Sequence, residues 1–228
     1  MNSVIIVAGG KGLRMGSEIP KQFLLLKSEP VIMHTIRVFY NWDNNCEIIL
    51  VLPSSQQSYW QLLVNQYDFE IPVKITTGGK TRFESVKNGL QKSSGDIIGI
   101  HDGVRPLVSE KTIKKCYEIS KSHGNAIPCV PIADSLRIVK NGKNQMIDRS
   151  KCFRIQTPQV FKRSIILKGF EQKFTKEFTD DASVVEKIGE TIQLVDGNEE
   201  NIKITKPFDL KIAEVFLEEA QSFKLSKK

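Results

Sequence analysis

The stretch Val4-Ile5-Ile6-Val7-Ala8-Gly9-Gly10-Lys11-Gly12-Leu13-Arg14-Met15-Gly16, close to the start of the chain, decides the fold. Its first four residues form a short β-branched run bounded by glycines, which predicts a buried strand. Glycines that follow a strand let backbone N–H groups approach an anion closely, because no Cβ stands in the way. Two cations, Arg14 and Lys21, come within the next dozen positions, so the loop suits a polyphosphate.

Two commoner phosphate-binding loops do not fit this glycine loop. The P-loop ends in Gly-Lys followed by Ser or Thr, and the stretch contains no such string. The dinucleotide fingerprint requires G-x-G-x-x-G, but Met15 stands where the third glycine belongs. Taken alone, the loop is equally compatible with an ordinary tight turn between a strand and a helix.

Length and composition predict one large α/β domain over residues 1–228. Of the 228 residues, 40% are hydrophobic and 26% are charged, values that are ordinary for a globular domain with a sizeable core. No apolar run approaches the length of a membrane span, and the first strand begins too close to Met1 to leave room for a secretory signal. The 4 cysteines are far apart and form no C-x-x-C pair, which indicates reduced thiols. We therefore expect a cytoplasmic protein without a membrane partner.

The net charge of +7 has two interpretations. It indicates either affinity for polyanions, such as nucleic acid or phosphorylated small molecules, or a solvated surface with no partner. The sequence has no basic block with interleaved aromatic residues, so we expect no nucleic-acid partner. The 3 histidines show no metal-binding spacing, and we expect no histidine metal site.

Strands and helices alternate through the first half of the chain. The apolar patterns predict strands over 47–52, 72–77, 96–101 and 125–130, with helices over 31–40, 55–66, 82–91 and 109–121. Such alternation predicts a single doubly wound, mostly parallel sheet. Sheets of this kind bind ligands at the carboxyl ends of their strands, which is where Gly9, Gly79 and Asp102 fall.

A β-hairpin is predicted after this sheet. Two alternating segments, 135–139 and 145–148, flank Lys140-Asn141-Gly142-Lys143, and Asn-Gly is the strongest short hairpin signal. We assign residues 132–153 to a protruding arm, which is either a decorated sheet edge or a dimerisation element. Helices over 162–171 and 180–188, a strand over 192–195 and a closing helix that begins at Pro207 complete the prediction.

The glycine loop, together with Pro20-Lys21-Gln22-Phe23, resembles the signature of nucleotidyltransferases that join a nucleotide to a sugar or polyol phosphate. In particular it is similar to that of the 2-C-methyl-D-erythritol 4-phosphate cytidylyltransferases. Further strings match this family in the same order: Gly78-Gly79-x-x-Arg82-x-x-Ser85-Val86, His101-Asp102-x-x-Arg105-Pro106, Asp134-Ser135, Arg149 eight residues before Thr157, Gln156-Thr157-Pro158-Gln159, Thr179-Asp180-Asp181-Ala182-Ser183 and Asn201-Ile202-Lys203-x-Thr205.

The resemblance covers nearly the whole chain, from Ala8 to Thr205. Gly103 replaces the family's usual alanine, and Ser135 replaces a threonine while keeping its hydroxyl. Ribitol 5-phosphate cytidylyltransferases share the loop, H-D-x-x-R-P and Q-T-P-Q. The T-D-D-A-S string at 179–183 favours the methylerythritol enzymes. The resemblance implies a Rossmann-like nucleotidyltransferase fold.

The resemblance also implies roles for individual residues. CTP would be bound by Ala8, Gly9, Gly10, Gly12, Gly79, Arg82, Ser85 and Asp102. The acceptor would be bound by Arg105, Ser135, Arg149, Thr157, Thr179 and Lys203. The catalytic residues would be Arg14 and Lys21 at the α-phosphate, with Arg149 and Lys203 at the acceptor phosphate. Asp102, at the mouth of a strand next to a triphosphate, suits Mg²⁺ that the CTP phosphates also hold.

Each of these residues has a plainer interpretation. Gly79 and Ser85 would otherwise form a helix cap, Asp102 and Arg105 a structural pair in a turn, and Arg149 an arginine on the hairpin surface. Asp180 and Asp181 are adjacent, so we expect them to cap the following helix rather than to act as a catalytic pair.

The reaction that the resemblance implies is attack by the acceptor phosphate on the α-phosphorus of CTP, which releases pyrophosphate. A phosphate monoester is already ionised near neutral pH and needs no general base, in keeping with the lack of a candidate catalytic histidine. Positioning and electrostatic stabilisation should supply most of the rate. The family also implies a homodimer, in which Arg149 would serve either its own or the partner's site. The alternatives are a ribitol 5-phosphate or other sugar-phosphate nucleotidyltransferase, and a non-catalytic nucleotide- or RNA-binding module.

Overall fold

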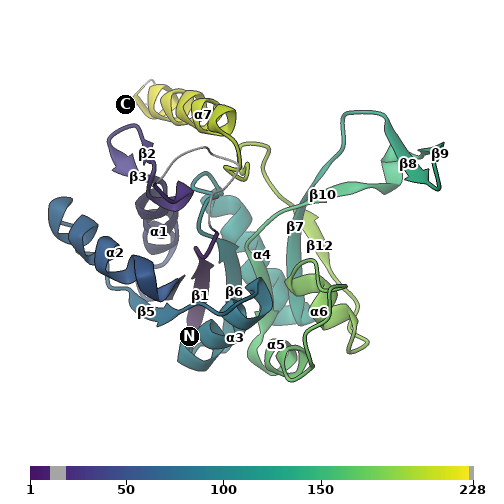
Figure 1. The fold of residues 1–228 in the computed structure, drawn as a ribbon, viewed down its shortest axis with the longest axis horizontal. Coiled ribbons are helices and arrows are strands. Elements are labelled where there is room, and N and C mark those ends of the chain that lie inside the picture. The colour runs from purple at the N-terminus through teal and green to yellow at the C-terminus, as the bar shows by residue number, and fades with distance from the viewer. Residues whose placement is uncertain (11–18, 226–228) are drawn as a thin grey trace.

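A central sheet organises the part of the chain that the computed structural model describes, which is residues 1–10 and 19–225 (Figure 1). Its strands are β1 (Asn2–Val7), β4 (Glu47–Leu52), β5 (Lys74–Thr77), β6 (Ile97–Asp102), β7 (Asn125–Pro131), β10 (Phe153–Ile155), β11 (Gln159–Lys162) and β12 (Leu194–Asp196). β5, β4, β1 and β6 lie side by side and parallel. β11 lies antiparallel between β6 and β7, while β12 pairs parallel and β10 antiparallel with β7. The predicted mostly parallel sheet is confirmed.

Helices cover both faces of the sheet, as the strand sequences require. Side chains alternate between the two faces of a strand, so Val4 and Ile6 of β1 pack on one side and Ile5 on the other. The first face is covered by α1 (Val31–Trp42), α2 (Ser54–Gln66) and α4 (Glu110–His123). The second is covered by α3 (Arg82–Lys92), α5 (Arg163–Phe170) and α6 (Asp181–Glu186). Because both faces are buried, these strands consist of nearly continuous apolar residues.

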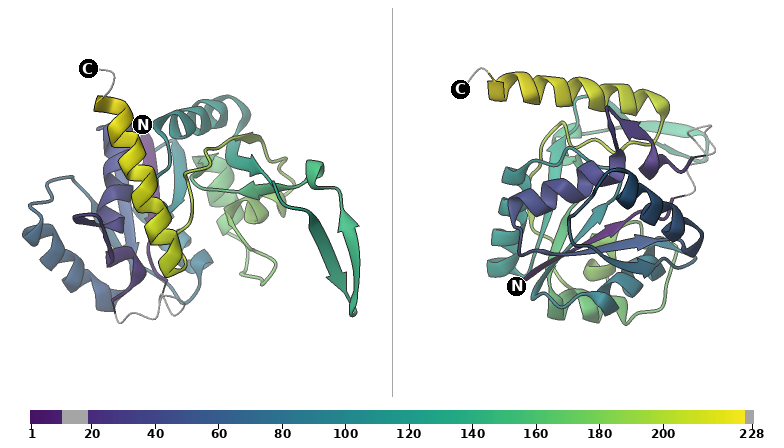
Figure 2. Two further views of the ribbon diagram at one scale, coloured as in Figure 1. Left: turned by 90° about the horizontal axis from the view of Figure 1, so that it is seen from above. Right: turned by 90° about the vertical axis from the view of Figure 1, so that its left-hand side faces the viewer.

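The last helix lies across the end of the sheet where the parallel strands finish (Figure 2). This helix, α7 (Pro207–Leu225), contacts the small hairpin of β2 (Leu25–Leu26) and β3 (Glu29–Pro30). Its Ala213 is fully buried in a third apolar cluster with Leu26 and Ile204. The helix therefore packs against the β2–β3 hairpin and against the segment that contains Ile204. None of the helices in the described residues combines the length and apolarity needed to cross a bilayer.

The predicted hairpin projects away from the sheet (Figure 1). β8 (Leu136–Lys140) and β9 (Lys143–Ile147) pair antiparallel. Asn141 and Gly142 between them have φ angles of 50° and 74°, the left-handed conformation that a two-residue hairpin turn of this kind requires. The side chains of Ile138, Val139 and Met146 are 52%, 70% and 70% exposed. The arm thus carries apolar residues that the described part of the chain leaves exposed.

Short strands are the main difference from the sequence prediction. β2, β3, β10 and β11 were not predicted, because each has two to four residues and shows no clear periodicity. β11 begins at Gln159 directly after the cis Thr157–Pro158 peptide bond, and a proline next to polar residues indicates a loop rather than a strand. The sheet therefore contains an antiparallel strand that the parallel β-helix-β pattern did not indicate.

Candidate functional site

A pocket of about 270 Å³ lies at the carboxyl ends of β1 and β6. It brings together residues from five separate segments of the chain, and each segment contributes at least one residue that was predicted to act on the substrates. These residues are Ala8, Gly9, Gly10, Lys21, Gly79, Arg82, Ser85, Asp102 and Lys203. The geometry thus assembles one site from motifs that lie up to 195 positions apart in the sequence.

Other predicted site residues lie elsewhere. Arg105 and Thr157 are behind Asp102 and do not line the pocket. Thr179 is exposed just before α6, and Ser135 and Arg149 are exposed on the arm. The guanidinium of Arg149 donates a hydrogen bond to the carbonyl of Ala133, also on the arm. Gly12 and Arg14 fall outside the described residues.

The turn after β1 forms one wall of the pocket. Its first carbonyl, that of Ala8, accepts a 2.8 Å hydrogen bond from the buried Gln22 side chain. A Cβ on Gly10 would lie 3.4 Å from Cε of Lys21, so the lysine stem rests against this glycine. The Lys21 ammonium donates to the carbonyl of Ile204 at 3.3 Å. Lys21 therefore connects the glycine turn to the segment that carries Lys203.

The turn after β5 forms the opposite wall. The hydroxyl of Ser85 accepts a hydrogen bond from the Gly79 N–H at 3.1 Å and donates one to the Thr81 carbonyl at 2.9 Å. Thr81 caps α3 by accepting from the Glu84 N–H. A Cβ on Gly79 would lie 2.2 Å from Cβ of Glu84, so only glycine fits there. Ser85 shapes this turn from beneath, which agrees with both the cap and the ligand-binding interpretations.

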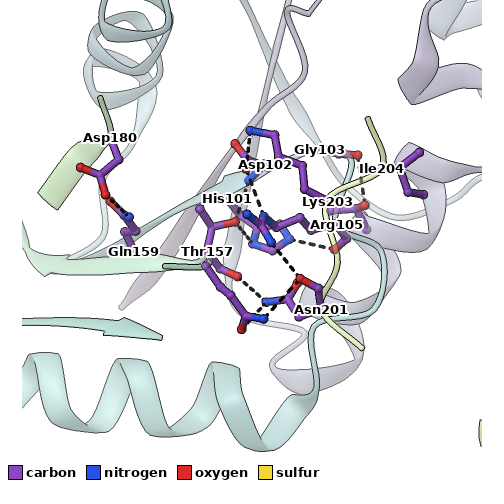
Figure 3. Close-up of polar contacts among 12 residues, drawn as sticks. His101, Asp102, Gly103, Arg105, Thr157, Gln159, Asp180, Asn201, Lys203 and Ile204 are labelled. Carbon is purple, nitrogen blue, oxygen red and sulfur yellow. Dashed lines mark hydrogen bonds and ion pairs between the residues drawn. The ribbon is translucent and has the colours of Figure 1, made fainter. Parts of the chain in front are cut away.

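Asp102 is the centre of charge in the pocket. It ends β6, and its Oδ2 atom lies 3.1 Å from Nε of Arg105 and 3.0 Å from Nζ of Lys203 (Figure 3). Its Oδ1 atom lies 3.8 Å from Nε of Arg82. Burial alone would raise the pKa of Asp102, but the positive charges of Arg82, Lys203 and Arg105 outweigh it and hold the pKa well below the usual range. The carboxylate is therefore ionised at neutral pH.

The two adjacent acids of the T-D-D-A-S string do different things. Asp180 caps α6, because its Oδ1 accepts the Ser183 N–H at 2.9 Å. Asp181 instead pairs with Arg82 through two hydrogen bonds, from Nη1 to Oδ1 at 2.8 Å and from Nη2 to Oδ2 at 2.7 Å. The prediction that both acids cap the helix is confirmed for Asp180 and wrong for Asp181, whose partner lies 99 residues away.

His101 is a buried structural residue beneath the pocket. Arg105 offers only its carbonyl oxygen to Nε2 at 3.0 Å, so Nε2 carries the proton and donates. Nδ1 then accepts from the Thr157 hydroxyl at 3.0 Å, and the same hydroxyl accepts the Asp102 N–H at 3.1 Å. Burial lowers the pKa of His101 from 6.5 to about 4. The imidazole is neutral at pH 7 and is enclosed within the protein.

Residues of the Q-T-P-Q string hold the segments around the site in place, and Figure 3 shows Thr157 next to His101 and, at the left, Gln159 bonded to Asp180. The Gln159 side chain donates to Asp180 and accepts the Ala182 N–H, both at 2.8 Å. The Gln156 amide donates to the Asn198 carbonyl at 2.8 Å. Asn201 donates to the Thr157 carbonyl at 2.8 Å. None of Gln156, Gln159 and Asn201 was predicted to have a role, although polar amides within short motifs can signal such buried hydrogen bonds.

The carboxylate of Asp102 fits a divalent cation only together with a ligand. Among the described residues, no group of three or more His, Cys, Asp or Glu side chains could hold a metal ion. Asp102 is ionised, and its Oδ1 receives no hydrogen bond from the described residues. One such oxygen matches the way Mg²⁺ is commonly held, by one or two carboxylates plus substrate phosphates and water.

Comparisons with known proteins agree on one family. The sequence model of the 2-C-methyl-D-erythritol 4-phosphate cytidylyltransferase family matches residues 2–219. A protein of that name from Phocaeicola vulgatus is 50% identical over 215 residues, which cover 94% of this chain and 98% of the relative. One from Clostridioides difficile is 40% identical over 95% of this chain and 94% of the relative. The crystal structure of 4-diphosphocytidyl-2C-methyl-D-erythritol synthase from Anaerococcus prevotii superimposes with a TM-score of 0.81 at 26% identity, covering 95% of both chains.

Proposed function

The chain belongs to the 2-C-methyl-D-erythritol 4-phosphate cytidylyltransferase family, and we propose that the pocket around Asp102 is its active site. The enzyme transfers the cytidylyl group of CTP to 2-C-methyl-D-erythritol 4-phosphate in the synthesis of isoprenoid precursors. Displacement at the α-phosphorus of CTP also releases pyrophosphate. The observation that carries the assignment of the site is the convergence of five separate segments on one pocket at the strand ends.

The charges in the pocket support a mechanism of positioning and electrostatic stabilisation. Lys21, Arg82 and Lys203 line it, and each would attract a phosphate group. The acceptor phosphate is already ionised, so the reaction needs no proton-accepting side chain, and the buried neutral His101 offers none. Lys21 would stabilise the negative charge that develops at the α-phosphorus, with Arg14 as a second cation by analogy with the family. Arg105, which reaches Asp102 and the carbonyl of Asn201, would hold Asp102 in place.

Mg²⁺ is the proposed cofactor. Asp102 would hold it together with the triphosphate of CTP, and the ion would neutralise phosphate charge when bound. The residues of the chain would keep that carboxylate ionised and fixed, because Arg105 and Lys203 occupy its other oxygen.

A homodimer would complete the acceptor site. Ser135 and Arg149 match the family's acceptor residues but lie on the arm, outside the pocket of the same chain. The arm also exposes Ile138, Val139 and Met146, and exposed apolar clusters mark protein–protein contacts. We infer that the arm reaches over a second subunit, where Arg149 binds the acceptor phosphate.

Subunit complementation tests this arrangement. Arg149→Ala should weaken use of the acceptor, and Lys203→Ala should impair the pocket itself. Mixing the two inactive variants under exchanging conditions should restore activity, because some dimers then hold one intact pocket facing an intact arm. Normal acceptor kinetics in Arg149→Ala would remove that residue from the site, and mixtures without recovery would place Arg149 in its own subunit's pocket.

Pyrophosphate release tests the function as a whole. Each of the four nucleoside triphosphates is offered with 2-C-methyl-D-erythritol 4-phosphate or ribitol 5-phosphate. We expect release only with CTP and the methylerythritol compound. Preference for ribitol 5-phosphate would favour the related cytidylyltransferases, and polyanion binding with a steep salt dependence but no release would indicate a non-catalytic module. The cytoplasmic location and the absence of a nucleic-acid partner stay predictions.

A further inference from the structure

Arg82 occupies an unusual position between two acids. It is the first residue of α3, where the helix dipole disfavours a cation, and its side chain is 32% exposed. The two terminal nitrogens of its guanidinium are both bound to Asp181, while Nε faces Asp102 at 3.8 Å. That distance is too long for a hydrogen bond. Arg82 therefore acts on Asp102 through its positive charge, without a hydrogen bond.

Asp181, the partner of Arg82, is buried and held in a fixed position. Its side chain is 1% exposed, and a buried carboxylate needs a charged or hydrogen-bonding partner. It is the first residue of α6, and the buried Gln159 fixes the start of that helix through Asp180 and the Ala182 N–H. The acid is thus anchored to the sheet, and its two-point bond to Arg82 has the geometry that fixes a guanidinium most strictly.

The consequence for Asp102 follows from what Arg82 would do without its partner. The guanidinium would be left with no acceptor for its two terminal nitrogens, and the nearest carboxylate oxygen is Oδ1 of Asp102. A fork–fork pair between Arg82 and Asp102 would cover that oxygen. It would also compete with Arg105 and Lys203 for Oδ2.

We propose that Asp181 is a positioning residue, which acts through Arg82 to keep Oδ1 of Asp102 open to the ligand in the pocket. This inference rests on the proposed function of that pocket. It assigns to the T-D-D-A-S string two separable tasks: Asp180 holds the helix, and Asp181 controls the cation next to the reactive carboxylate. Because such second-layer partners typically change metal affinity or activity by about 10- to 100-fold, the effect is measurable.

Neutralising each acid in turn provides a matched pair of variants. Asp181→Asn removes the charge and one of the two acceptors, whereas Asp180→Asn makes the same chemical change one residue earlier and keeps a good helix cap. In Asp181→Asn, we expect kcat to fall about 10- to 100-fold, and the Mg²⁺ concentration for half-maximal activity to rise by a similar factor. In Asp180→Asn, both values should stay within about twofold of the wild type, since a cap affects stability rather than the pocket.

Calorimetric binding of CTP supplies a readout besides activity. With Mg²⁺ present, Asp181→Asn should bind CTP more weakly than the wild type. Without Mg²⁺, the two proteins should bind it almost equally, because the positive charges remain in the pocket. If the Arg82–Asp181 pair were purely structural, Asp181→Asn would lower the melting temperature but would leave the effect of Mg²⁺ on CTP binding unchanged. A folded Asp181→Asn protein with wild-type Mg²⁺ dependence in both assays would therefore overturn the proposal.

Arg82→Lys keeps the experiment decisive where Asp181→Asn does not fold. Lysine retains the charge but cannot form the two-point bond that holds Arg82 on Asp181, so its ammonium would be free to pair with Oδ1 of Asp102, and the same rise in the Mg²⁺ requirement is expected. An unchanged requirement would overturn the proposal. Where both single variants fold, the double variant should lose no more activity than the worse single variant, because both substitutions act through one contact. Fully additive losses would contradict the proposal that Asp181 acts through Arg82. Pyrophosphate release by the wild type checks the proposed function separately: an inactive wild type refutes that function, and an active wild type with an unaffected Asp181→Asn refutes only the role of Asp181.

Discussion

Replacing Thr157 by valine separates two interpretations of the Q-T-P-Q string. The family resemblance assigns Thr157 to the acceptor, but in the structure its hydroxyl is buried and bonded to both His101 and the backbone of Asp102. Valine has nearly the same shape and leaves two buried groups without partners: Nδ1 of His101 and the N–H of Asp102. A buried polar group without its hydrogen bond costs about 1 to 3 kcal/mol, so the variant, which leaves two such groups, should lose about 2 to 6 kcal/mol of stability.

Thermal unfolding and steady-state kinetics together measure this effect. For a chain of this size, 1 kcal/mol shifts the melting temperature by about 2 to 4 °C, so a fall of about 4 to 24 °C is expected for Thr157→Val. Thr157→Ser keeps the hydroxyl and should lose less than about 1 kcal/mol. The KM values for CTP and for the acceptor should change by similar factors, because the altered group supports the floor of the pocket. An unchanged melting temperature with a selectively raised acceptor KM would refute this reasoning and make Thr157 an acceptor contact.

Three further outcomes are expected. The pKa of His101 is lowered from 6.5 to about 4, so its contribution to the free energy of unfolding is fully present above pH 6.5 and is lost as the pH falls towards 4, by about 3 kcal/mol in total. Urea denaturation across this range should show the free energy of unfolding falling with pH, and His101→Asn should flatten this dependence. A Cβ on Gly103 would lie 2.8 Å from Cδ1 of Ile32 and 2.9 Å from Cβ of Ala8, so Gly103→Ala should lower the free energy of unfolding by about 1 to 3 kcal/mol. Adding Ile32→Val, which removes Cδ1, should recover part of this loss in the same assay, and a double variant no more stable than Gly103→Ala would contradict the contact. Lys21→Ala should lower kcat far more than it raises the KM for CTP, and an unchanged kcat would remove Lys21 from the mechanism.

The sequence predicts the sheet well because burial on both faces has a direct signature. Runs such as Glu47–Leu52 are apolar at nearly every position, and the glycines that follow β1, β5 and β6 mark the edge where the pocket lies. The antiparallel strand at Gln159 was missed because its stability comes from neighbours on both sides, β6 and β7, and not from its own composition. Local propensity carries no information about such tertiary support.

The roles of the polar residues were harder to predict, for a geometric reason. Spacing predicted that Gly9, Gly79 and Asp102 fall at strand ends, so their meeting in one pocket was predictable, whereas Lys203, which lies in a loop, was assigned to the site only by the family resemblance. Spacing did not show direction, and the two acids at 180 and 181 illustrate this. At the start of a helix, consecutive side chains diverge, so Asp180 turns back to its own helix while Asp181 reaches Arg82.

Two carboxylates, Asp102 in the pocket lining and Asp181 behind Arg82, weaken the attraction of the site for a polyphosphate, but they fix the positive charges in place. Arg82 and Arg105 are held by Asp181 and Asp102 before any ligand arrives, so little reorganisation is needed when phosphate enters, and preorganised charge is the form that lowers a barrier most. Three cations face two carboxylates around Asp102, which leaves one positive charge in excess. Removing an acid would raise that excess, yet it would also free a guanidinium to move. The two acids therefore fix the guanidinium groups in place and weaken the attraction for phosphate only slightly. Variants that neutralise Asp181 should lower the rate of the chemical step more than they weaken the binding of metal-free CTP.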